Sequence, residues 1–357
     1  MVHLWQTEKK RMKLRGDLPL DLKTGRIDMT HGSGGRAMAQ LIERIFARAF
    51  DNPALAENND QARLDFPVGK LAFSTDSFVV SPLFFPGGDI GSLAVHGTVN
   101  DVAMSGAKPL WLSAGFIIEE GFPLSDLARI TDSMAAAAVK CGVAIVTGDT
   151  KVVERGKADG LYINTAGIGA VPDGVDLSAG NVKPGDAILL SGPIGEHGMA
   201  VMSRRENLSF DSEILSDSAP LHGLVETMLA AGAGIHALRD PTRGGLAAAL
   251  NEIAQAANVG MRIDEREVPV SPAVQSACEI LGLDPLYVAN EGRLIAFCKA
   301  DDSGKLCDAM RRHEQGRKAA VIGRVVEDRH NFVEMHTILG GRRIVDWPAG
   351  EPLPRIC

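Results

Sequence analysis

Two kinds of short apolar segment alternate along most of this chain, and this alternation constrains the fold more than any other feature of the sequence. In some segments the apolar residues lie three and four positions apart, which is typical of a core-facing helix, and others are brief apolar runs typical of strands. The pattern predicts helices over residues 36–50, 90–104, 124–140, 223–231 and 246–257. It predicts strands over residues 70–75, 111–117, 143–147, 161–170, 187–191, 294–299 and 319–325. The sequence therefore predicts an α/β (α+β) fold.

A turn-rich stretch separates the two halves of this pattern. Residues 171–185 are rich in proline and glycine, as domain linkers commonly are. At about 150 residues per domain, a chain of 357 residues also indicates two domains. We expect a first domain over residues 28–178 and a second over residues 179–342, each with a mixed sheet and packed helices.

The two ends of the chain differ from the domains. Residues 1–27 are rich in Lys and Arg and show no sustained helical period, which predicts a mobile basic arm. Residues 343–357 carry three prolines after Trp347, which forbid a helix and favour an extended, unpaired tail ending on Cys357.

Charge and composition exclude several classes of protein. The 37 Lys and Arg residues against 45 Asp and Glu give a net charge of -8, which argues against a nucleic-acid binder. No apolar run approaches the roughly 18 residues of a membrane span, so we expect a water-soluble protein. Five cysteines without CxxC spacing, and an N-terminus without an apolar signal core, favour the cytoplasm.

Acidic residues recur beside predicted strand ends and turns. The four motifs contain Asp76, Asp101, Asp149 and Asp240. Carboxylates at strand ends converge readily on one edge of a sheet, and Mg²⁺ takes a few such oxygens together with substrate phosphates. A single Asp at such a position is more often a turn residue or helix cap, so the repetition carries the prediction.

A glycine-rich loop, His31-Gly-Ser-Gly-Gly35, precedes the first predicted helix. Such a loop exposes backbone N–H groups at a helix N-terminus, where phosphate binds favourably. The dinucleotide-binding fingerprint is formally satisfied, but no buried strand precedes it, so that interpretation fails. A flexible turn that caps the helix is the alternative.

Three further positions are candidates for the same chemistry. Gly91 and Asp101 share one face of the predicted 90–104 helix with small residues, so either a ligand or a packed element approaches that face closely. Lys151 could reach a phosphate as a point charge or be an ordinary surface lysine. Glu291 occupies a turn before a predicted strand, where it is either a base or an unpaired turn residue.

The terminal Cys357 is the most unusual feature. An extended tail of about 15 residues reaches as far as ~50 Å, enough to carry a thiol between a donor and an active site. The neighbouring α-carboxylate opposes thiolate formation unless Arg355 or a docking partner compensates. The other four cysteines fall in predicted helices and strands and are expected to be buried.

Together these motifs resemble the HypE family of hydrogenase maturation proteins, within the PurM-like (aminoimidazole ribonucleotide synthetase) ATP-binding superfamily. The resemblance spans residues 28–357. Its motifs are His31–Gly35, Ser74–Ser77, Pro86–Gly91, Val99–Asp101, Gly148–Lys151, Asp240–Gly245, Asn290–Gly292 and Pro354–Cys357. Variants of the glycine-rich and acidic motifs also occur in selenophosphate synthetase and thiamine monophosphate kinase, whereas the terminal Pro-Arg-Ile-Cys is the most specific.

The resemblance implies a two-domain PurM-like enzyme that dimerises through its first domain and uses ATP and Mg²⁺. It implies that the carbamoyltransferase HypF loads a carbamoyl group on Cys357. This chain then dehydrates the group to a thiocyanate, and the cyanide passes to the HypC–HypD scaffold that builds the iron centre of [NiFe] hydrogenase.

The resemblance also assigns residue roles. It implies that ATP is bound by His31, Gly32, Gly34, Gly35, Asp76, Gly91, Asp149, Thr150, Arg243 and Gly244. Mg²⁺ is expected on Asp76, Asn100, Asp101, Asp149 and Asp240. The expected catalytic residues are Cys357 as carrier, Glu291 as base and Lys151 opposite the transferring phosphoryl group. Two alternatives stay open: a small-molecule synthetase of the same superfamily, and a noncatalytic, nucleotide-responsive maturation scaffold.

Overall fold

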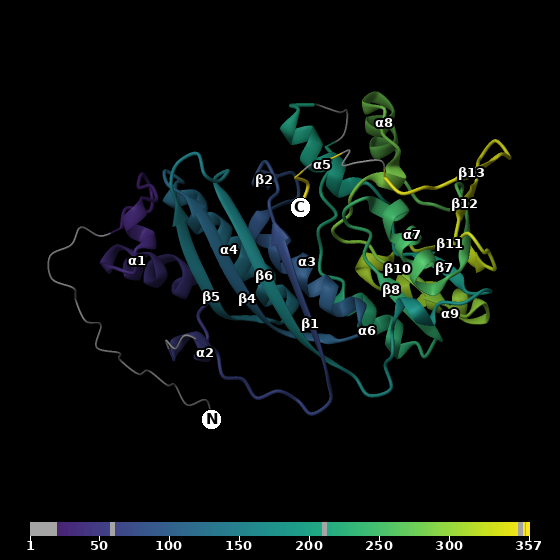
Figure 1. Cartoon of the computed structure of the whole chain (residues 1–357), viewed down its shortest axis with the longest axis horizontal. Coiled ribbons are helices and arrows are strands. Elements are labelled where there is room, and N and C mark those ends of the chain that lie inside the picture. Colours follow the sequence, from purple (N-terminus) through teal and green to yellow (C-terminus); the bar gives the residue numbers. More distant parts are fainter. Residues whose placement is uncertain (1–19, 58–60, 209–212, 349–352, 354) are drawn as a thin grey trace.

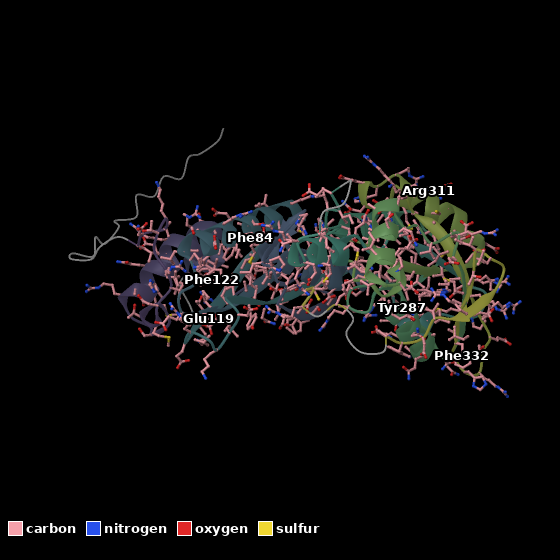
Figure 2. All side chains as sticks on the ribbon, turned by 90° about the horizontal axis from the view of Figure 1, so that it is seen from above. Phe84, Glu119, Phe122, Tyr287, Arg311 and Phe332 are labelled. Carbon is pink, nitrogen blue, oxygen red and sulfur yellow. The ribbon has the colours of Figure 1, made fainter. Side chains whose placement is uncertain are left out.

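The computed structural model describes residues 20–57, 61–208, 213–348, 353 and 355–357. Two mixed α/β halves lie next to each other along the long axis of the molecule (Figure 1). Seen from above, Phe84, Glu119 and Phe122 mark the first half, and Tyr287, Arg311 and Phe332 mark the second (Figure 2).

The first half is one four-stranded sheet with helices against one face. Its helical elements are η1 (Met29–Gly32), α1 (Arg36–Leu41), the π-helical η2 (Ile42–Ala47), α2 (Pro53–Ala56), α3 (Ile90–Met104) and α4 (Leu124–Cys141). Its strands are β1 (Lys70–Phe78), β2 (Phe84–Phe85), β3 (Gly88–Asp89), β4 (Lys108–Glu119), β5 (Ala144–Val153) and β6 (Leu161–Val171). The sheet order is β1-β6-β4-β5, with β4 and β5 parallel and the other pairs antiparallel.

The two faces of this sheet differ in character. Side chains that alternate along the strands, such as Phe78 and Phe116, point into a core shared with α3 and α4. The opposite face, which we call the open face, exposes Leu71, Phe73 and Ile117 at 53%, 64% and 45%. Exposed apolar residues on a sheet face mark a surface that a partner can cover.

The second half is a seven-stranded sheet in the order β13-β12-β9-β11-β7-β10-β8. Its strands are β7 (Ala187–Leu190), β8 (Ile235–Arg239), β9 (Gly260–Asp264), β10 (Ile295–Cys298), β11 (Ala320–Val326), β12 (Val333–His336) and β13 (Arg342–Ile344). Its helices are α5 (Glu196–Arg205), α6 (His222–Ala230), α7 (Gly245–Ala257), α8 (Pro272–Leu281) and α9 (Ser303–Arg311). Four short 3-10 turns complete it: η3 (Ala179–Asn181), η4 (Pro285–Tyr287), η5 (Ala300–Asp302) and η6 (Glu314–Gly316).

Helix α3 connects the two halves. Its last residues, Ala103 and Met104, join a core cluster formed otherwise by α6, α9 and the strands of the second sheet. One continuous helix therefore packs on both sheets, which holds the edge of the first half against the second (Figure 1).

The fold class predicted from the sequence is confirmed, and α3 begins and ends where its apolar period predicted. Strands β1 and β5 extend beyond their apolar runs through alternating polar residues, because one face of the sheet is open. The sequence did not indicate several shorter elements: α2, α5, α8, α9, β2, β3, β8, β9, β12 and β13. Across the described ranges, every helix is too short or too polar to cross a bilayer.

The expectations for the two ends need correction. Most of the arm predicted over residues 1–27 lies outside the described residues, but residues 20–27 contact the first domain. Ile27 is 1% exposed, and its carbonyl accepts a hydrogen bond from the Gly121 N–H at 2.7 Å. The unpaired tail is also wrong for the residues described, because residues 355–357 pair with residues 79–81.

Candidate active site

Five carboxyl side chains gather where the two halves meet. They come from β1, α3, the loop before α6, the end of β8 and the turn before β10: Asp76, Asp101, Asp217, Asp240 and Glu291. We call them the interdomain cluster. The negative charges of the four aspartates each raise the pKa of Glu291. The five groups therefore share one electrostatic environment.

Glu291 is the most deeply buried member of the interdomain cluster. The residue is 3% exposed, and its Oε1 atom has no hydrogen-bond partner within the structure. Burial, reinforced by the neighbouring Asp240, raises the pKa of Glu291 well above its ordinary value. A buried carboxyl group with an unsatisfied oxygen is costly, so its retention indicates a functional role.

The turn that carries Glu291 is fixed from both sides. The Asn290 side chain donates to the Pro241 carbonyl at 2.8 Å and accepts from the Gly195 N–H at 2.7 Å. Glu291 N–H donates to Asp217 Oδ1 at 3.1 Å. A Cβ on Gly292 would lie 1.8 Å from the Asp217 carbonyl oxygen, so only glycine permits this close approach.

Asn100 connects the first domain to the same turn. Its side-chain amide donates to the carbonyls of Ala219 (3.0 Å) and Glu291 (3.3 Å), and its oxygen accepts from Leu221 N–H (2.8 Å). All of these groups are buried. Asn100 was expected to bind a metal, but here its side chain is occupied in joining the domains.

Mutual repulsion and burial raise the pKa of several members of the cluster. Burial raises the pKa of Asp76 and of Asp101, although Asp101 also accepts a hydrogen bond from Ser74 Oγ at 2.8 Å. Burial, with the nearby Asp101 carboxylate, raises the pKa of Asp240 to about 7. A site with this excess of carboxyl groups favours cations and can accept protons.

Arginines line the solvent side of the cluster. Arg239 and Arg243 border a cavity of about 420 Å³ that also contacts Leu353 and Ile356 of the tail. The positive charge of Arg243 opposes the rise in the pKa of Asp76. Gly244 follows with a φ of +75° and is the N-cap residue of α7. The motif thus places a cation next to the cluster and a glycine where the backbone is left-handed.

The end of the tail lies beside this site. The Cys357 carbonyl accepts from Val79 N–H at 3.0 Å, three residues beyond Asp76. At ~3.3 Å per extended residue, Val79 lies roughly 10 Å along the chain from Asp76. The tail is therefore bonded to the backbone about that far from the aspartate. Figure 1 shows the C-terminus between the two halves, next to α5.

Cys357 is also the cysteine best suited to react. Burial raises the pKa of Cys141 and Cys298 to about 12 and that of Cys278 to about 11, and it also raises the pKa of Cys307. These four thiols are buried, whereas Cys357 is only half-buried. The expectation that the four internal cysteines are structural is confirmed by their burial.

A second group of predicted site residues lies elsewhere, at β5. Asp149 and Lys151 form an exposed ion pair (Oδ2 to Nζ, 2.8 Å), and the hydrogen bond from Lys151 lowers the pKa of Asp149. The glycine-rich loop packs beside them, because a Cβ on Gly32 would lie 2.8 Å from Val152 Cβ. We call residues 31–35 and 149–151 the β5 edge group.

The remaining members of the β5 edge group suit a nucleotide. His31 is buried and its Nδ1 accepts from Asp28 N–H at 3.1 Å, while Gly34 adopts a φ of +76°. Thr150 lines a cavity of about 550 Å³ with three phenylalanines, Phe46, Phe50 and Phe116. An aromatic-lined cavity beside a basic group and exposed backbone N–H groups is compatible with a base and its phosphates.

The predicted convergence of all four aspartates on one sheet edge is wrong within a single chain. The strand register places four residues side by side across the sheet: Ser77, Asn164, Gly115 and Asp149. The side chains of Ser77, Asn164 and Asp149 point to the open face. Asp76 lies one residue away and points to α3, where its Oδ2 lies 3.8 Å from the Cβ position of Gly97. Three strand spacings, about 14 Å, also separate Asp149 from Ser77.

Gly91 has a packing explanation rather than a place in either group. A Cβ there would lie 2.3 Å from the Ile130 carbonyl oxygen of α4. Of the two explanations for the small face of α3, helix packing therefore accounts for this position.

The oxygen, nitrogen and sulfur groups of the described side chains limit how this chain could bind a metal. In the part of the chain that the structure describes, no three His, Cys, Asp or Glu side chains are close enough to hold an ion. Mg²⁺ commonly binds one or two carboxylates and takes its other ligands from phosphate and water. The carboxylates of the cluster are of the type that a metal shared with a nucleotide would use.

Sequence reasoning missed the residues that hold the tail. His197 Nε2 lies 2.9 Å from the Ile356 carbonyl, and Arg205 Nη2 lies 2.7 Å from the Arg355 carbonyl. Both belong to α5, which the sequence pattern did not indicate. The Gly195-Glu-His-Gly198 segment was the available signal, because such a turn exposes backbone at a helix start.

Comparison with known proteins identifies the family. Residues 58–171 match the model of the AIR synthase related protein N-terminal domain, and residues 183–336 match that of the C-terminal domain. The carbamoyl dehydratase HypE of Azotobacter vinelandii is 62% identical over 338 residues, covering 95% of this chain and 99% of that protein. The chain belongs to the HypE family of carbamoyl dehydratases.

Two solved structures of HypE proteins are also similar. One, a hydrogenase maturation protein HypE in complex with ATP, gives a TM-score of 0.89 at 49% identity and covers 92% of this chain and 99% of that one. The other, from a HypE–HypF complex, gives a TM-score of 0.76 at 53% identity and covers 86% and 99%. The predicted membership of the HypE family is confirmed.

Proposed function

We propose that this chain catalyses the ATP-dependent dehydration of an S-carbamoyl group on Cys357 to a thiocyanate, for the cyanide ligands of the iron centre in [NiFe] hydrogenase. The observation that carries the proposal is the docking of the Cys357 end of the tail beside the interdomain cluster. The family relation supports the same reaction.

The net reaction balances without any redox partner. The carbamoyl thioester and ATP give the thiocyanate, ADP and inorganic phosphate, so the oxygen of the amide leaves on phosphate. ATP supplies the activation, because an amide oxygen becomes a good leaving group only once it is phosphorylated. The two N–H protons must be accepted by groups near the tail.

Glu291 is the proposed base. Its carboxylate, once ionised, is strongly basic because burial and its acidic neighbours raise its pKa. Its Oε1 atom is available because it accepts no hydrogen bond within the structure. Asp217 and Asn290 orient the turn, so the carboxyl group is held by its backbone rather than by its own oxygens.

ATP and Mg²⁺ are proposed to use both groups of residues. His31, Gly32, Gly34, Gly35, Asp149, Thr150 and Lys151 offer backbone donors, a cavity and a cation for the nucleotide. Asp76, Asp101 and Asp240 offer hard oxygen atoms for Mg²⁺, with Arg243 and Gly244 next to them. Asn100 and Gly91 are proposed to support these elements, because their own contacts are with protein.

A homodimer would reconcile the separation of the two groups. Both edges of the first sheet, β1 and β5, are unpaired in the sheet order, and its open face is apolar. Two copies packed on their open faces, related by an axis along the strands, would place β5 of one copy beside β1 of the other. Asp149 of the second copy would then face Ser77, one residue along β1 from Asp76.

Three further assignments follow from the proposed reaction. HypF is the proposed source of the carbamoyl group, supported by the complex known for a similar HypE. A HypC–HypD scaffold is the proposed acceptor of the cyanide. The cytoplasm is the proposed location, as the cysteine pattern of the sequence favours.

Intact mass measurement tests the function. Incubation with ATP, carbamoyl phosphate and the carbamoyltransferase should add one carbamoyl group to the chain and then remove one water. Cys357→Ala should show neither change while still binding ATP. Loading without loss of water would instead support a scaffold, and turnover of a free small molecule by Cys357→Ala would support a small-molecule synthetase.

A further inference from the structure

The last three residues of the chain are held through their backbone. Every carbonyl from Arg355 to Cys357 accepts a hydrogen bond. Arg355 O accepts from Ser81 N–H (3.2 Å) and Arg205 Nη2 (2.7 Å), and Ile356 O accepts from His197 Nε2 (2.9 Å). Cys357 O accepts from Val79 N–H (3.0 Å). We call His197, Arg205 and residues 79–81 the tail dock.

Side chains add direction to this backbone pairing. Arg355 has a φ of +55°, a left-handed conformation that an arginine seldom adopts. Ile356 is consequently 3% exposed and packs in the first core, whereas the Arg355 guanidinium contacts Asp159 and the Val79 carbonyl. The tail can therefore dock in one register and with one face inward.

The tautomer of His197 is determined by its partners. Burial lowers the pKa of His197, which favours the neutral ring. The Ile356 carbonyl beside Nε2 can only accept a hydrogen bond, so Nδ1 is the accepting nitrogen and Ser216 Oγ, 2.7 Å away, donates to it. The proton on the ring is then on Nε2, which donates to the tail.

The same loop also reaches the proposed base. Ser216 contacts His197, and the next residue, Asp217, accepts the Glu291 N–H at 3.1 Å. Glu196, beside His197, bonds Arg293 at 2.6 Å, two residues beyond Glu291. The carbonyl of the penultimate tail residue and the backbone of the base are thus joined through a few buried groups.

We propose that His197 and Arg205 are positioning residues for the dehydration: they hold the tail backbone so that Cys357 stays in register with Glu291. This inference rests on the proposed function for its substrate. Loading requires the thiol to be accessible to a partner, so a weaker dock exposes Cys357 while it slows the later step. The two effects have opposite signs, and recovery of both by an amide donor at residue 197 distinguishes positioning from a general loss of structure.

The experiment uses four full-length variants in two assays. The first assay is alkylation of Cys357 by a maleimide, and the second is single-turnover formation of thiocyanate from chain already carbamoylated on Cys357. His197→Leu removes the donor, and His197→Gln restores an amide donor at similar reach. Arg205→Met removes the guanidinium hydrogen bonds to the Ser81 and Arg355 carbonyls but keeps an apolar stem, and Arg204→Met is the exposed control on the same helix.

His197→Leu loses one hydrogen bond to the tail. We therefore expect Cys357 in this variant to be alkylated about three- to tenfold faster, and thiocyanate to form about three- to tenfold more slowly. Arg205→Met, which loses bonds to two carbonyls, should shift both rates by about tenfold or more. His197→Gln and Arg204→Met should stay within about twofold of the parent chain.

Unchanged alkylation in Arg205→Met would overturn the dock, and faster alkylation without slower dehydration would overturn its role in register. If His197→Leu does not fold, Arg205→Met still tests the tail dock, because Arg205 is only half-buried. Failure of the parent chain to form thiocyanate would contradict the proposed function, but the alkylation assay would still test the dock.

Discussion

The aspartates of the interdomain cluster and the aspartate of the β5 edge group lie in opposite environments. In the cluster, burial and like charges raise the pKa of Asp76, Asp101, Asp240 and Glu291. At the β5 edge, Asp149 is exposed, pairs with Lys151, and has a lowered pKa. The first environment is suited to accepting protons and cations, and the second to holding a mobile anion that exchanges with solvent.

The largest effect should come from removing the base. Glu291→Gln keeps the shape of the buried turn but cannot accept a proton. We expect thiocyanate formation to fall by about 10² to 10⁴-fold, with carbamoyl loading and ATP affinity retained. Single-turnover assays on preloaded chain measure this. A normal rate would place the base elsewhere, with His31 the next candidate, and a variant that cannot be loaded would make Glu291 a docking residue.

The next prediction asks whether the two regions act across a dimer. Asp149→Asn and Lys151→Ala should each reduce ATP-dependent turnover by roughly ten- to a hundredfold, because each removes a charged contact to phosphate or metal. When Asp149→Asn and Glu291→Gln chains are mixed equally, mixed dimers each contain one intact site, which restores about a quarter of the activity. No recovery on mixing would show that each chain completes its own site.

Stability should respond to pH with opposite signs in the two regions. The pKa of Asp240 is about 7 in the folded chain and 3.8 in its reference state, so this group stabilises the fold most below pH 4. That contribution is lost as pH rises through about 7. Asp240→Asn should therefore raise the free energy of unfolding at pH 8 by about 1 to 4 kcal/mol, with little change near pH 4.

Asp149→Asn is the matched control for this measurement. Its lowered pKa makes the carboxylate stabilising above its ordinary titration range, so the variant should be slightly less stable at pH 8. The exposed pair limits this loss to within about 1 kcal/mol. Urea unfolding at pH 4 and pH 8 measures both variants. Destabilisation by Asp240→Asn at pH 8 would contradict the contrast.

The smallest effect on the single chain concerns the open face. Phe73 is 64% exposed, so Phe73→Thr should change the free energy of unfolding of a separated chain by no more than about 0.5 kcal/mol. In the proposed homodimer it should weaken self-association by about 1 to 3 kcal/mol. Sedimentation equilibrium measures this difference. Unchanged association would remove the open face from the dimer interface.

Local pattern was sufficient for the elements with strong periods. Helix α3 and strand β10 follow from their apolar residues, and Glu291 lies in the turn that its neighbours predicted. Short elements such as α5 and β12 were missed because their few apolar residues give no clear period. Glycines within α5 and α9 weaken the helical signal further.

The candidate site was predicted only as far as local sequence determines it. The motifs indicated which acidic residues are candidates, but not that Asp149 faces away from Asp76. The direction of the Asp149 side chain depends on how far β5 continues past its apolar residues. Polar residues alternate with apolar ones there because one face of the sheet is open, so no clear strand end is evident in the sequence. The tail dock depends on pairing between residues 79–81 and 355–357, and no local rule links segments so far apart in sequence.

The bonds made by Asn100 determine which part of the molecule can move. Its three hydrogen bonds to Ala219, Leu221 and Glu291 are buried, so a hinge between the halves would have to break all of them at once. At about 1 kcal/mol each, with unsatisfied groups left behind, such opening is disfavoured. Helix α3 adds apolar contacts to the same barrier. The two halves are therefore expected to keep a fixed relative orientation during catalysis. The substrate then reaches the site by docking of the C-terminal segment rather than by closure of one half on the other.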